Sequence, residues 1–170
     1  RVTAHTGIDA LSHAVEGYLS TKCGGIIEPL ALESCRLVRD ALPRVLEDPC
    51  DIDGRETLLP ASLEGGIALS TCGTVFVHAL GYRLTQRFGY SHGHANALML
   101  GSFVRVLAER GSDRAHRVLD VFDGDLSAFI RTMGVSPDIA ASDVDAASLE
   151  DWTDSGWNAY GRPNAVADIV

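Results

Sequence analysis

Apolar residues recur at helical intervals along most of this chain, and this periodicity limits what it can fold into. Residues 28–46 show it best, because their apolar positions follow the spacing of one helix rather than the alternation of a strand. These positions are Leu30, Leu37, Val38, Ala41, Leu42 and Val45. Alternating β-branched runs bounded by turns, which are typical of strands, are nearly absent. The sequence therefore predicts an all-α fold, a helical bundle.

Breaker residues and capping signals divide the chain into predicted helices. Thr6 is placed to cap a first helix that begins at Gly7, with Asp9 three residues after the cap, as in a capping box. Ser91 is placed to cap another helix that runs through Val106. The remaining predicted helices cover 28–46, 55–70, 73–87, 113–122 and 126–133. Residues 134–145 are expected to form a loop, and residues from 146 onward helical fragments.

Length, charge and cysteine spacing exclude several classes of protein. A chain of 170 residues with 46% hydrophobic content can form one domain, 1–170, with a substantial core. The net charge of −9, without a cluster of basic residues, argues against a nucleic-acid partner. No apolar run approaches the ~20 residues of a membrane helix, and no secretory signal is visible. We therefore expect a cytoplasmic protein that does not enter a membrane. The four cysteines show no C-x-x-C spacing, which favours reduced thiols over a zinc knuckle.

Four potential metal ligands lie in two short segments. The segment T-G-I-D-A-L-S-H-A-V-E contains Asp9 and His13, which share a helix face because they are four residues apart. The second segment, V-H-A-L-G-Y-R-L-T-Q-R-F-G-Y-S-H-G-H-A-N-A, contains His78 and His92. One carboxylate and three imidazoles suit a single divalent transition metal. Each residue alone has an ordinary structural explanation, so the prediction rests on their meeting at one point.

The two segments resemble the paired metal-binding signatures of the iron-containing alcohol dehydrogenases. The resemblance covers Thr6–Glu16 and Val77–Ala97 and fades after about residue 105. It implies the fold of that family's C-terminal all-helical domain, which has the dehydroquinate synthase-like architecture. It also implies an NAD(P)-dependent dehydrogenase that acts on a small-molecule alcohol or aldehyde, with Fe²⁺ or Zn²⁺ as the ion. The metal ligands that it implies are Asp9, His13, His78 and His92.

The sequence departs from the family signature at several positions. Many members have a second histidine four residues after the third ligand, near the nicotinamide, and here that position is Tyr82. Tyr82 is therefore our candidate catalytic residue, placed to orient the substrate or to pass a proton to solvent. We expect the neighbouring Arg83 to face solvent. His94 is not part of the usual signature and is expected to point away from the ligands. We interpret His5 and His116 as structural or exposed residues.

The iron-containing alcohol dehydrogenases bind NAD(P) through a glycine-rich turn in an N-terminal α/β domain. This sequence contains no such turn. The pairs at 24–25 and 65–66 lack its context, and no predicted strand precedes them. The second pair instead predicts close helix packing. We therefore expect the metal-binding half of an enzyme, inactive without its nucleotide-binding domain. The apolar interface left by that domain favours self-association, although the sequence leaves the size of a homo-oligomer open.

Two alternatives stay open at this stage. One is the metal-binding domain of an enzyme like dehydroquinate synthase or glycerol dehydrogenase, which share the two-domain design. The other is a non-enzymatic helical domain with incidental histidines, which would bind no metal. A helical phosphohydrolase and a zinc protease are less favoured, since the sequence has neither a His-Asp dipeptide nor an H-E-x-x-H pattern.

Overall fold

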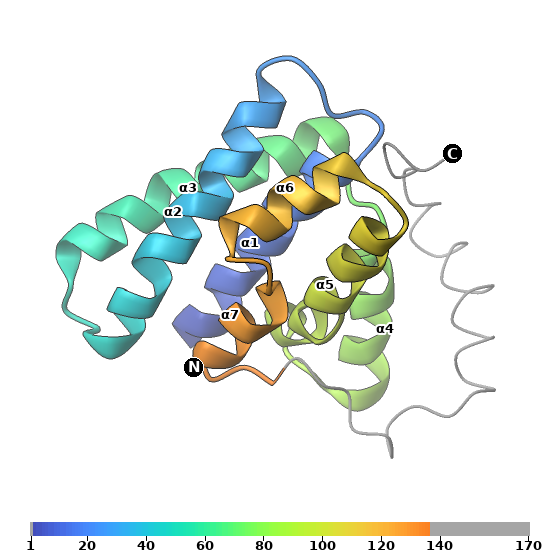
Figure 1. Ribbon diagram of the computed structural model, residues 1–170. Coiled ribbons are helices and arrows are strands. Elements are labelled where there is room, and N and C mark those ends of the chain that lie inside the picture. The colour runs from blue at the N-terminus through green and yellow to red at the C-terminus, as the bar shows by residue number, and fades with distance from the viewer. Residues whose placement is uncertain (1, 137–170) are drawn as a thin grey trace.

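The computed structural model describes residues 2–136, and in this range it contains seven α-helices and no β-strand (Figure 1). The predicted all-α class is therefore confirmed for this part of the chain. The helices are α1 Val2–Leu19, α2 Ile27–Glu47, α3 Ile52–Cys72, α4 Val77–Phe88, α5 His92–Glu109, α6 Asp113–Val121 and α7 Leu126–Thr132. The predicted loop beyond 136 and the predicted helical fragments from 146 onward lie outside the described residues.

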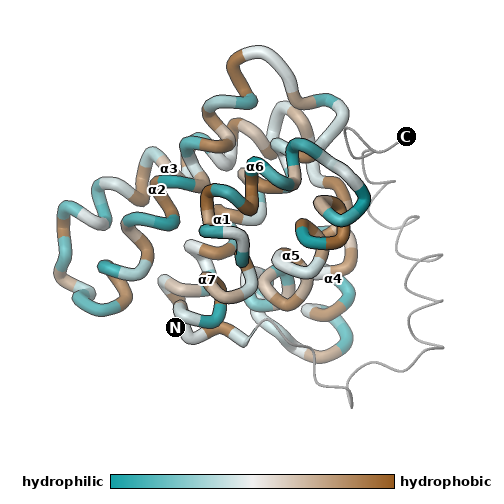
Figure 2. The backbone as a smooth tube through the Cα atoms, in the orientation of Figure 1, coloured by the Kyte–Doolittle hydropathy of each residue, from teal (hydrophilic) through white to brown (hydrophobic). Residues whose placement is uncertain are grey.

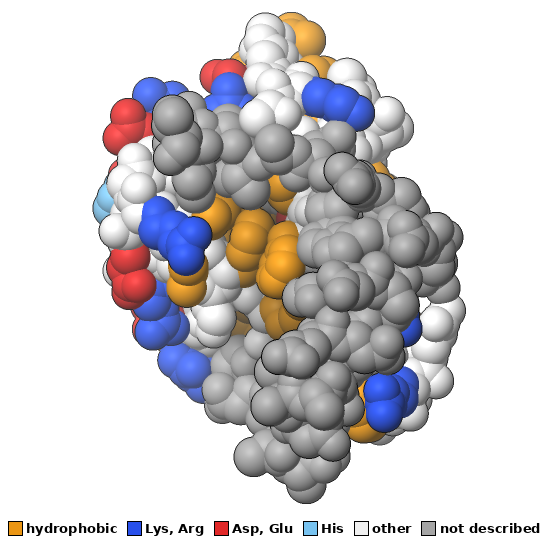
Figure 3. Space-filling view, turned by 90° about the vertical axis from the view of Figure 1, so that its right-hand side faces the viewer, with side chains coloured by type: hydrophobic (Ala, Val, Ile, Leu, Met, Phe, Trp, Pro, Cys, Tyr) orange, Lys and Arg blue, Asp and Glu red, His pale blue; other side chains and the backbone are white. Residues whose placement is uncertain are grey.

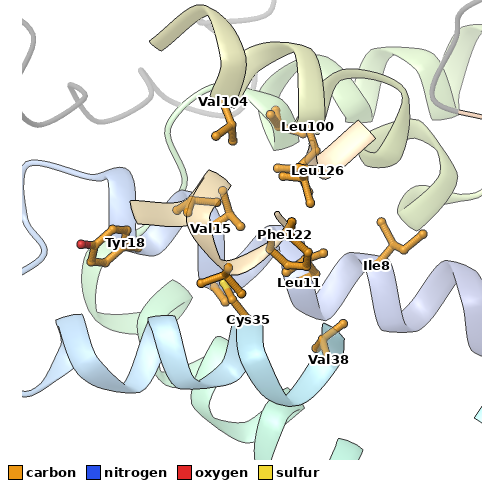
Figure 4. Close-up of a cluster of buried hydrophobic side chains, with 14 of the residues drawn as sticks. Ile8, Leu11, Val15, Tyr18, Cys35, Val38, Leu100, Val104, Phe122 and Leu126 are labelled. Carbon is orange, nitrogen blue, oxygen red and sulfur yellow. The ribbon is translucent and has the colours of Figure 1, made fainter. Parts of the chain in front are cut away.

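Helix α1 lies at the centre of the bundle, where it contacts α2, α3, α4, α5 and α6. The α2–α3 hairpin extends on one side of α1, and α4 and α5 lie on the other (Figure 1). Ile8, Leu11, Val15 and Tyr18 are spaced along one side of α1, and each is 0% exposed. Figure 4 shows them packed among side chains of the surrounding helices. Central α1 is therefore fixed from several directions, and so are the polar residues on its other side.

Apolar and charged side chains are separated as this packing requires. Hydrophobic positions along the helices turn inward, and hydrophilic positions lie mainly at the periphery (Figure 2). On the face shown in Figure 3, basic and acidic side chains alternate along one edge.

No single described helix is both long and apolar enough to cross a membrane. Helices α3 and α4 pass that test only as a pair, with a bend of 104° between them.

Several helix boundaries differ from the predictions, each for a local reason. The predicted cap at Thr6 is wrong, because α1 already begins at Val2 and the Thr6 hydroxyl donates to the Val2 carbonyl at 3.1 Å. Helix α3 begins earlier than predicted, because the Asp51 carboxylate accepts the Gly54 N–H and caps it. Helix α4 begins four residues later than predicted, after Gly73 ends α3 with a φ of 70°.

Two glycines allow helices to approach α1 closely. A Cβ at Gly65 of α3 would lie 2.8 Å from the Ala10 carbonyl oxygen of α1, so the predicted close packing holds there. Gly66 has open space around it and does not contribute. A Cβ at Gly93 of α5 would overlap the backbone carbonyl of His5 on α1. The absence of a side chain at Gly93 therefore lets α5 begin directly against α1.

Candidate metal centre

Three helices bring the predicted ligands together. Asp9 and His13 lie one turn apart on α1, whereas His78 is the second residue of α4 and His92 the first residue of α5. Asp9 Oδ1 is 3.6 Å from His78 Nε2 and 3.6 Å from His92 Nε2. One ligand atom from each of these three residues lies within 4.8 Å of the other two. Such spacing fits donors around one ion with bonds of about 2.0–2.2 Å.

His13 borders this group of three. Its Nε2 lies 3.8 Å from Asp9 Oδ2, and its ring stacks on His78 with 4.8 Å between the ring centroids. It is not one of the residues whose ligand atoms all lie within 4.8 Å of one another. The structure thus places the fourth predicted ligand beside the other three, and the ligand roles of all four stay predictions.

The Glu16 carboxylate fixes His78 and the start of α4. Glu16 is 0% exposed. Its Oε1 accepts the backbone N–H groups of residues 75, 76 and 77 at 2.9, 2.6 and 2.8 Å. Its Oε2 accepts the backbone N–H of His78 at 3.0 Å and also contacts the Nδ1 of that imidazole. Four N–H groups at a helix start are thereby satisfied by one buried anion.

Glu16 lies within the first of the two ligand-containing segments, and no role was predicted for it. Its position offered one signal, since it lies seven residues after Asp9 and so returns to a similar side of α1. Because Glu16 is a carboxylate, the Nδ1 of His78 donates to it. The other ring nitrogen of His78, Nε2, then faces Asp9, with 3.6 Å between Nε2 and Oδ1. This carboxylate–histidine arrangement is the usual support for a metal-binding imidazole.

The surroundings of His78 Nε2 are those of a metal-binding nitrogen. It is buried, and no hydrogen-bond partner for it exists among residues 2–136, since Asp9 at 3.6 Å is too far for one. Burial lowers the pKa of His78, but the Asp9 and Glu16 carboxylates outweigh burial and raise the pKa to about 9. A buried nitrogen that faces a carboxylate without hydrogen-bonding it suits a cation placed between them.

The other donors tend toward the protonation states that metal binding needs. Burial opposes ionisation of Asp9, but the three neighbouring histidines outweigh it and lower the pKa of this carboxyl. Burial, together with the charge of His78, lowers the pKa of both His13 and His92, against the attraction of Asp9. An ionised carboxylate and neutral imidazoles are the ligand forms of these side chains.

Asn96 of α5, a second residue without a predicted role, holds Asp9 in place. Its Nδ2 donates to Asp9 Oδ1 at 2.9 Å, and its Oδ1 lies directly against Gly81 of α4. A Cβ at Gly81 would overlap that oxygen. The absence of a side chain at Gly81 therefore makes room for the Asn96 side chain, and this contact supports the orientation of Asp9.

The remaining predicted residues surround the ligands. The Tyr82 ring stacks on His92 with 4.9 Å between centroids, and Tyr82 is 38% exposed. Arg83 is half-buried, so the expectation that it faces solvent is wrong. His94 points away from the ligand group, as expected, and packs on His5. The side chains of Asp9 and His13 are each 23% exposed and that of His92 is 32% exposed, so the centre opens to the surface of the described residues.

Sequence comparisons assign this chain to a known family. The family model described as "Fe-containing alcohol dehydrogenase family, C-terminal" matches residues 3–167. Long-chain-alcohol dehydrogenase 1 of Geobacillus thermodenitrificans is 33% identical over 127 residues, which cover 75% of this chain and 32% of that protein. Alcohol dehydrogenase 4 of Schizosaccharomyces pombe is 36% identical over 99 residues, 58% of this chain and 24% of that protein.

Solved structures agree with the sequence comparisons. An iron-containing alcohol dehydrogenase from Thermotoga maritima superimposes with a TM-score of 0.82 at 33% identity, covering 97% of this chain and 45% of that one. Sulfoacetaldehyde reductase from Bifidobacterium kashiwanohense, solved with NAD⁺, gives a TM-score of 0.79 at 25% identity and covers 95% and 46%. The chain thus spans less than half the length of these relatives. It belongs to the iron-containing alcohol dehydrogenase family and corresponds to that family's C-terminal helical domain.

Proposed function

We propose that Asp9, His13, His78 and His92 hold one divalent metal ion, and that this chain is the metal-binding part of an NAD(P)-dependent alcohol dehydrogenase. The reaction would interconvert an alcohol and an aldehyde or ketone, with hydride exchanged with a nicotinamide. The observation that supports this most directly is the convergence of the buried Nε2 of His78 and the Nε2 of His92 on Asp9 Oδ1. The curated relatives, which are alcohol and propanediol dehydrogenases, support the reaction class.

Different residues of this chain would have different roles at such a site. When bound, the ion would supply Lewis-acid polarisation of the substrate oxygen. Glu16 keeps the Nε2 of His78 aimed into the site, and Asn96 keeps one oxygen of Asp9 there. The exposed edge at His13 and His92 is the side from which a substrate can enter. Tyr82, stacked on His92 at this edge, is placed to orient a substrate or to pass a proton to solvent.

Either Fe²⁺ or Zn²⁺ suits the donor set. One carboxylate and three imidazoles bind both ions, and neither role above requires a redox-active metal. The description of the family favours iron, whereas the general order of affinities favours zinc over Fe²⁺ at a given site. We therefore propose that the supply of each metal decides whether Fe²⁺ or Zn²⁺ occupies the site.

The nucleotide would bind to a different part of the enzyme. Residues 2–136 contain no strand and so no strand–turn–helix unit for a dinucleotide. The resemblance to a reductase solved with NAD⁺, of which this chain covers 46%, supports NAD(P) use by an assembled enzyme. In that enzyme, a nucleotide-binding domain would face the open edge of the metal centre.

Metal analysis is the first test. The purified chain, reconstituted with Zn²⁺ or Fe²⁺ and then dialysed, should retain one tightly held ion, and Asp9→Asn should lose it. A control substitution at exposed Glu109 should keep the ion. Failure of the wild-type chain to retain either metal after reconstitution would count against the proposed site and favour a helical domain with incidental histidines.

Enzyme activity is the second test, and it distinguishes the proposed metal site from the proposed reaction. An enzyme that joins this chain to a nucleotide-binding domain should reduce NAD(P)⁺ in the presence of a primary alcohol, and Asp9→Asn should abolish that turnover. The chain alone should produce no reduced cofactor. Sustained turnover by the chain alone would show that the nucleotide site is misplaced, and a metal-loaded full enzyme that turns over no alcohol would contradict the proposed reaction class.

A further inference from the structure

The first turn of α5, which begins with the proposed ligand His92, lacks a side-chain cap. Ser91 occupies the N-cap position, but its hydroxyl accepts no N–H of α5, all of which lies within the described residues, so the cap predicted there is wrong. The turn contains no acidic residue either. Ser112, at the N-cap of α6, does accept the Ala115 N–H at 3.2 Å. The start of α5 is therefore held by contacts from outside the helix.

The Ser91 hydroxyl instead forms a hydrogen bond with α1. Its Oγ lies 2.5 Å from the Nδ1 of His5, 86 positions earlier in the chain. Because a hydroxyl both donates and accepts, this bond forms with either tautomer of the imidazole. His5 lies one turn before Asp9, and Ser91 directly precedes His92. One hydrogen bond thus joins the two helices next to two of the proposed ligands.

The residues that follow Ser91 also lie against His5. The backbone of buried Gly93 is so close that a Cβ there would overlap the His5 carbonyl. The ring of His94 packs on the ring of His5 with 5.2 Å between their centroids. Residues 91, 93 and 94 therefore all contact one residue of α1, and His92 lies between them. The position of the His92 backbone thus depends on the surroundings of His5.

We propose that His5 and Ser91 are positioning residues of the metal centre, whose shared hydrogen bond holds the first turn of α5 and so keeps His92 in place to bind the ion. The inference rests on the proposed metal site. Neither residue touches the ion. Glu16 supports the imidazole of His78 directly, whereas this hydrogen bond acts through the backbone of the ligand that it supports.

Zn²⁺ titration of the metal-free chain tests this role. Ser91→Ala and His5→Phe each remove the hydrogen bond, and His5→Phe keeps an aromatic ring against His94. Each variant should bind Zn²⁺ roughly 3- to 10-fold more weakly, as expected from the loss of one hydrogen bond. Ser91→Thr keeps the hydroxyl and should retain the wild-type affinity. Unchanged affinity in both Ser91→Ala and His5→Phe would overturn the proposal.

Hydrogen exchange gives a second readout that requires no metal. The Ala95 N–H donates to the Ser91 carbonyl at 2.9 Å and so reports the order of the first turn of α5. It should exchange faster in metal-free Ser91→Ala and His5→Phe than in the wild-type chain. A wild-type chain that binds no Zn²⁺ would overturn the proposed metal site, and the exchange of Ala95 would still show whether the hydrogen bond holds α5.

The double variant that combines Ser91→Ala with His5→Phe shows whether the two residues act together. Since each single change removes the same bond, the double variant should bind Zn²⁺ about as weakly as either single variant. Losses that multiply in the double variant would contradict a shared role. Ser91 is exposed, so Ser91→Ala should leave the helical circular dichroism unchanged and is the decisive variant if His5→Phe lowers it.

Ser112→Ala is the matched control, because it removes a serine hydroxyl from the start of α6, a helix that supplies no proposed ligand. Loss of its cap should lower the urea midpoint and leave the Zn²⁺ affinity of the folded chain unchanged. An equal loss of Zn²⁺ affinity in Ser112→Ala and Ser91→Ala would show that general destabilisation causes the effect, and would overturn the positioning role.

Discussion

The carboxylate of Glu16 contacts the Nδ1 of His78 and, with the same two oxygens, accepts four backbone N–H groups at the start of α4. The orientation of a proposed ligand and the position of its helix are therefore set by one buried side chain. Displacing that carboxylate would move both together. This coupling gives the metal centre its sharpest structural test.

Glu16→Gln should weaken metal binding by roughly 10- to 100-fold, the usual cost of losing such a supporting carboxylate. The amide keeps the size of the side chain, but only one of its two head atoms accepts hydrogen bonds, so N–H groups of α4 or His78 lose a partner. We also expect a loss of about 1–3 kcal/mol in the free energy of unfolding. Zn²⁺ titration and urea unfolding measure the two effects.

Exposed Glu109 provides the control for this variant, because Glu109→Gln makes the same chemical change away from the centre. It should leave both metal affinity and stability within ~0.5 kcal/mol of the wild-type chain. Unchanged metal affinity in Glu16→Gln would show that Glu16 holds the helix without supporting the ligand.

His78→Ala should abolish retention of the tightly held ion and leave the helical circular dichroism largely intact. The imidazole is 3% exposed and its Nε2 lies 3.6 Å from Asp9 Oδ1, whereas the backbone N–H groups of α4 keep their Glu16 partner. Elemental analysis after dialysis measures the ion. His116→Ala, at an exposed histidine, is the comparison and should retain it. Unchanged content of the tight ion in His78→Ala would remove His78 from the ligand set.

The stability of the metal-free chain should fall as pH rises from about 6.5 to 9. The folded-state pKa of His78 is raised from 6.5 to about 9. The folded state therefore holds a proton that the unfolded state has released in this range. This contribution is fully present below 6.5 and is lost as pH rises through 9. The pKa values of His13 and His92 are lowered, so their titration affects stability below this window.

Urea midpoints measured across this range test the pH dependence, with His78→Gln as the reference. The thiols of Cys23 and Cys35, whose pKa values burial raises to about 12, add a loss in the same direction above ~8.5. The difference between wild type and variant isolates the histidine. A wild-type midpoint that rises with pH relative to His78→Gln would contradict the assigned protonation. Bound metal should reverse the trend, because protons compete with the ion for the ligands.

Gly81→Ala should destabilise the fold by about 1–3 kcal/mol, because its Cβ would overlap the Asn96 oxygen and force that side chain to move. Since Asn96 also holds Asp9, metal affinity should fall with stability. Gly66→Ala is the matched change on α3, where no atom lies within 4 Å of the new Cβ. It should stabilise the chain by roughly 0.5–1 kcal/mol. Equal effects of the two substitutions would mean that Gly81 is not a packing constraint.

Sequence patterns alone predict the helical class, the extents of α2, α6 and α7 to within about a residue, and the two segments that contain the predicted ligands. These features are local: they follow from periodicity, breakers and an i,i+4 spacing. The placement of His92 at the start of a helix was predictable for the same reason. The cap at Thr6 was not, because packing against the rest of the bundle extends α1 beyond that signal.

The residues that support the centre are identified by long-range packing, which sequence patterns do not predict. Glu16 and His78 are 62 positions apart, and Asn96 and Asp9 are 87 apart. Such contacts depend on how closely two helices approach each other. Gly81 and Gly93 permit a close approach because they have no side chain. The pairing of His5 with His94 has the same origin. The periodicity of the sequence does not predict this histidine contact, because the contact forms where the surfaces of two helices meet.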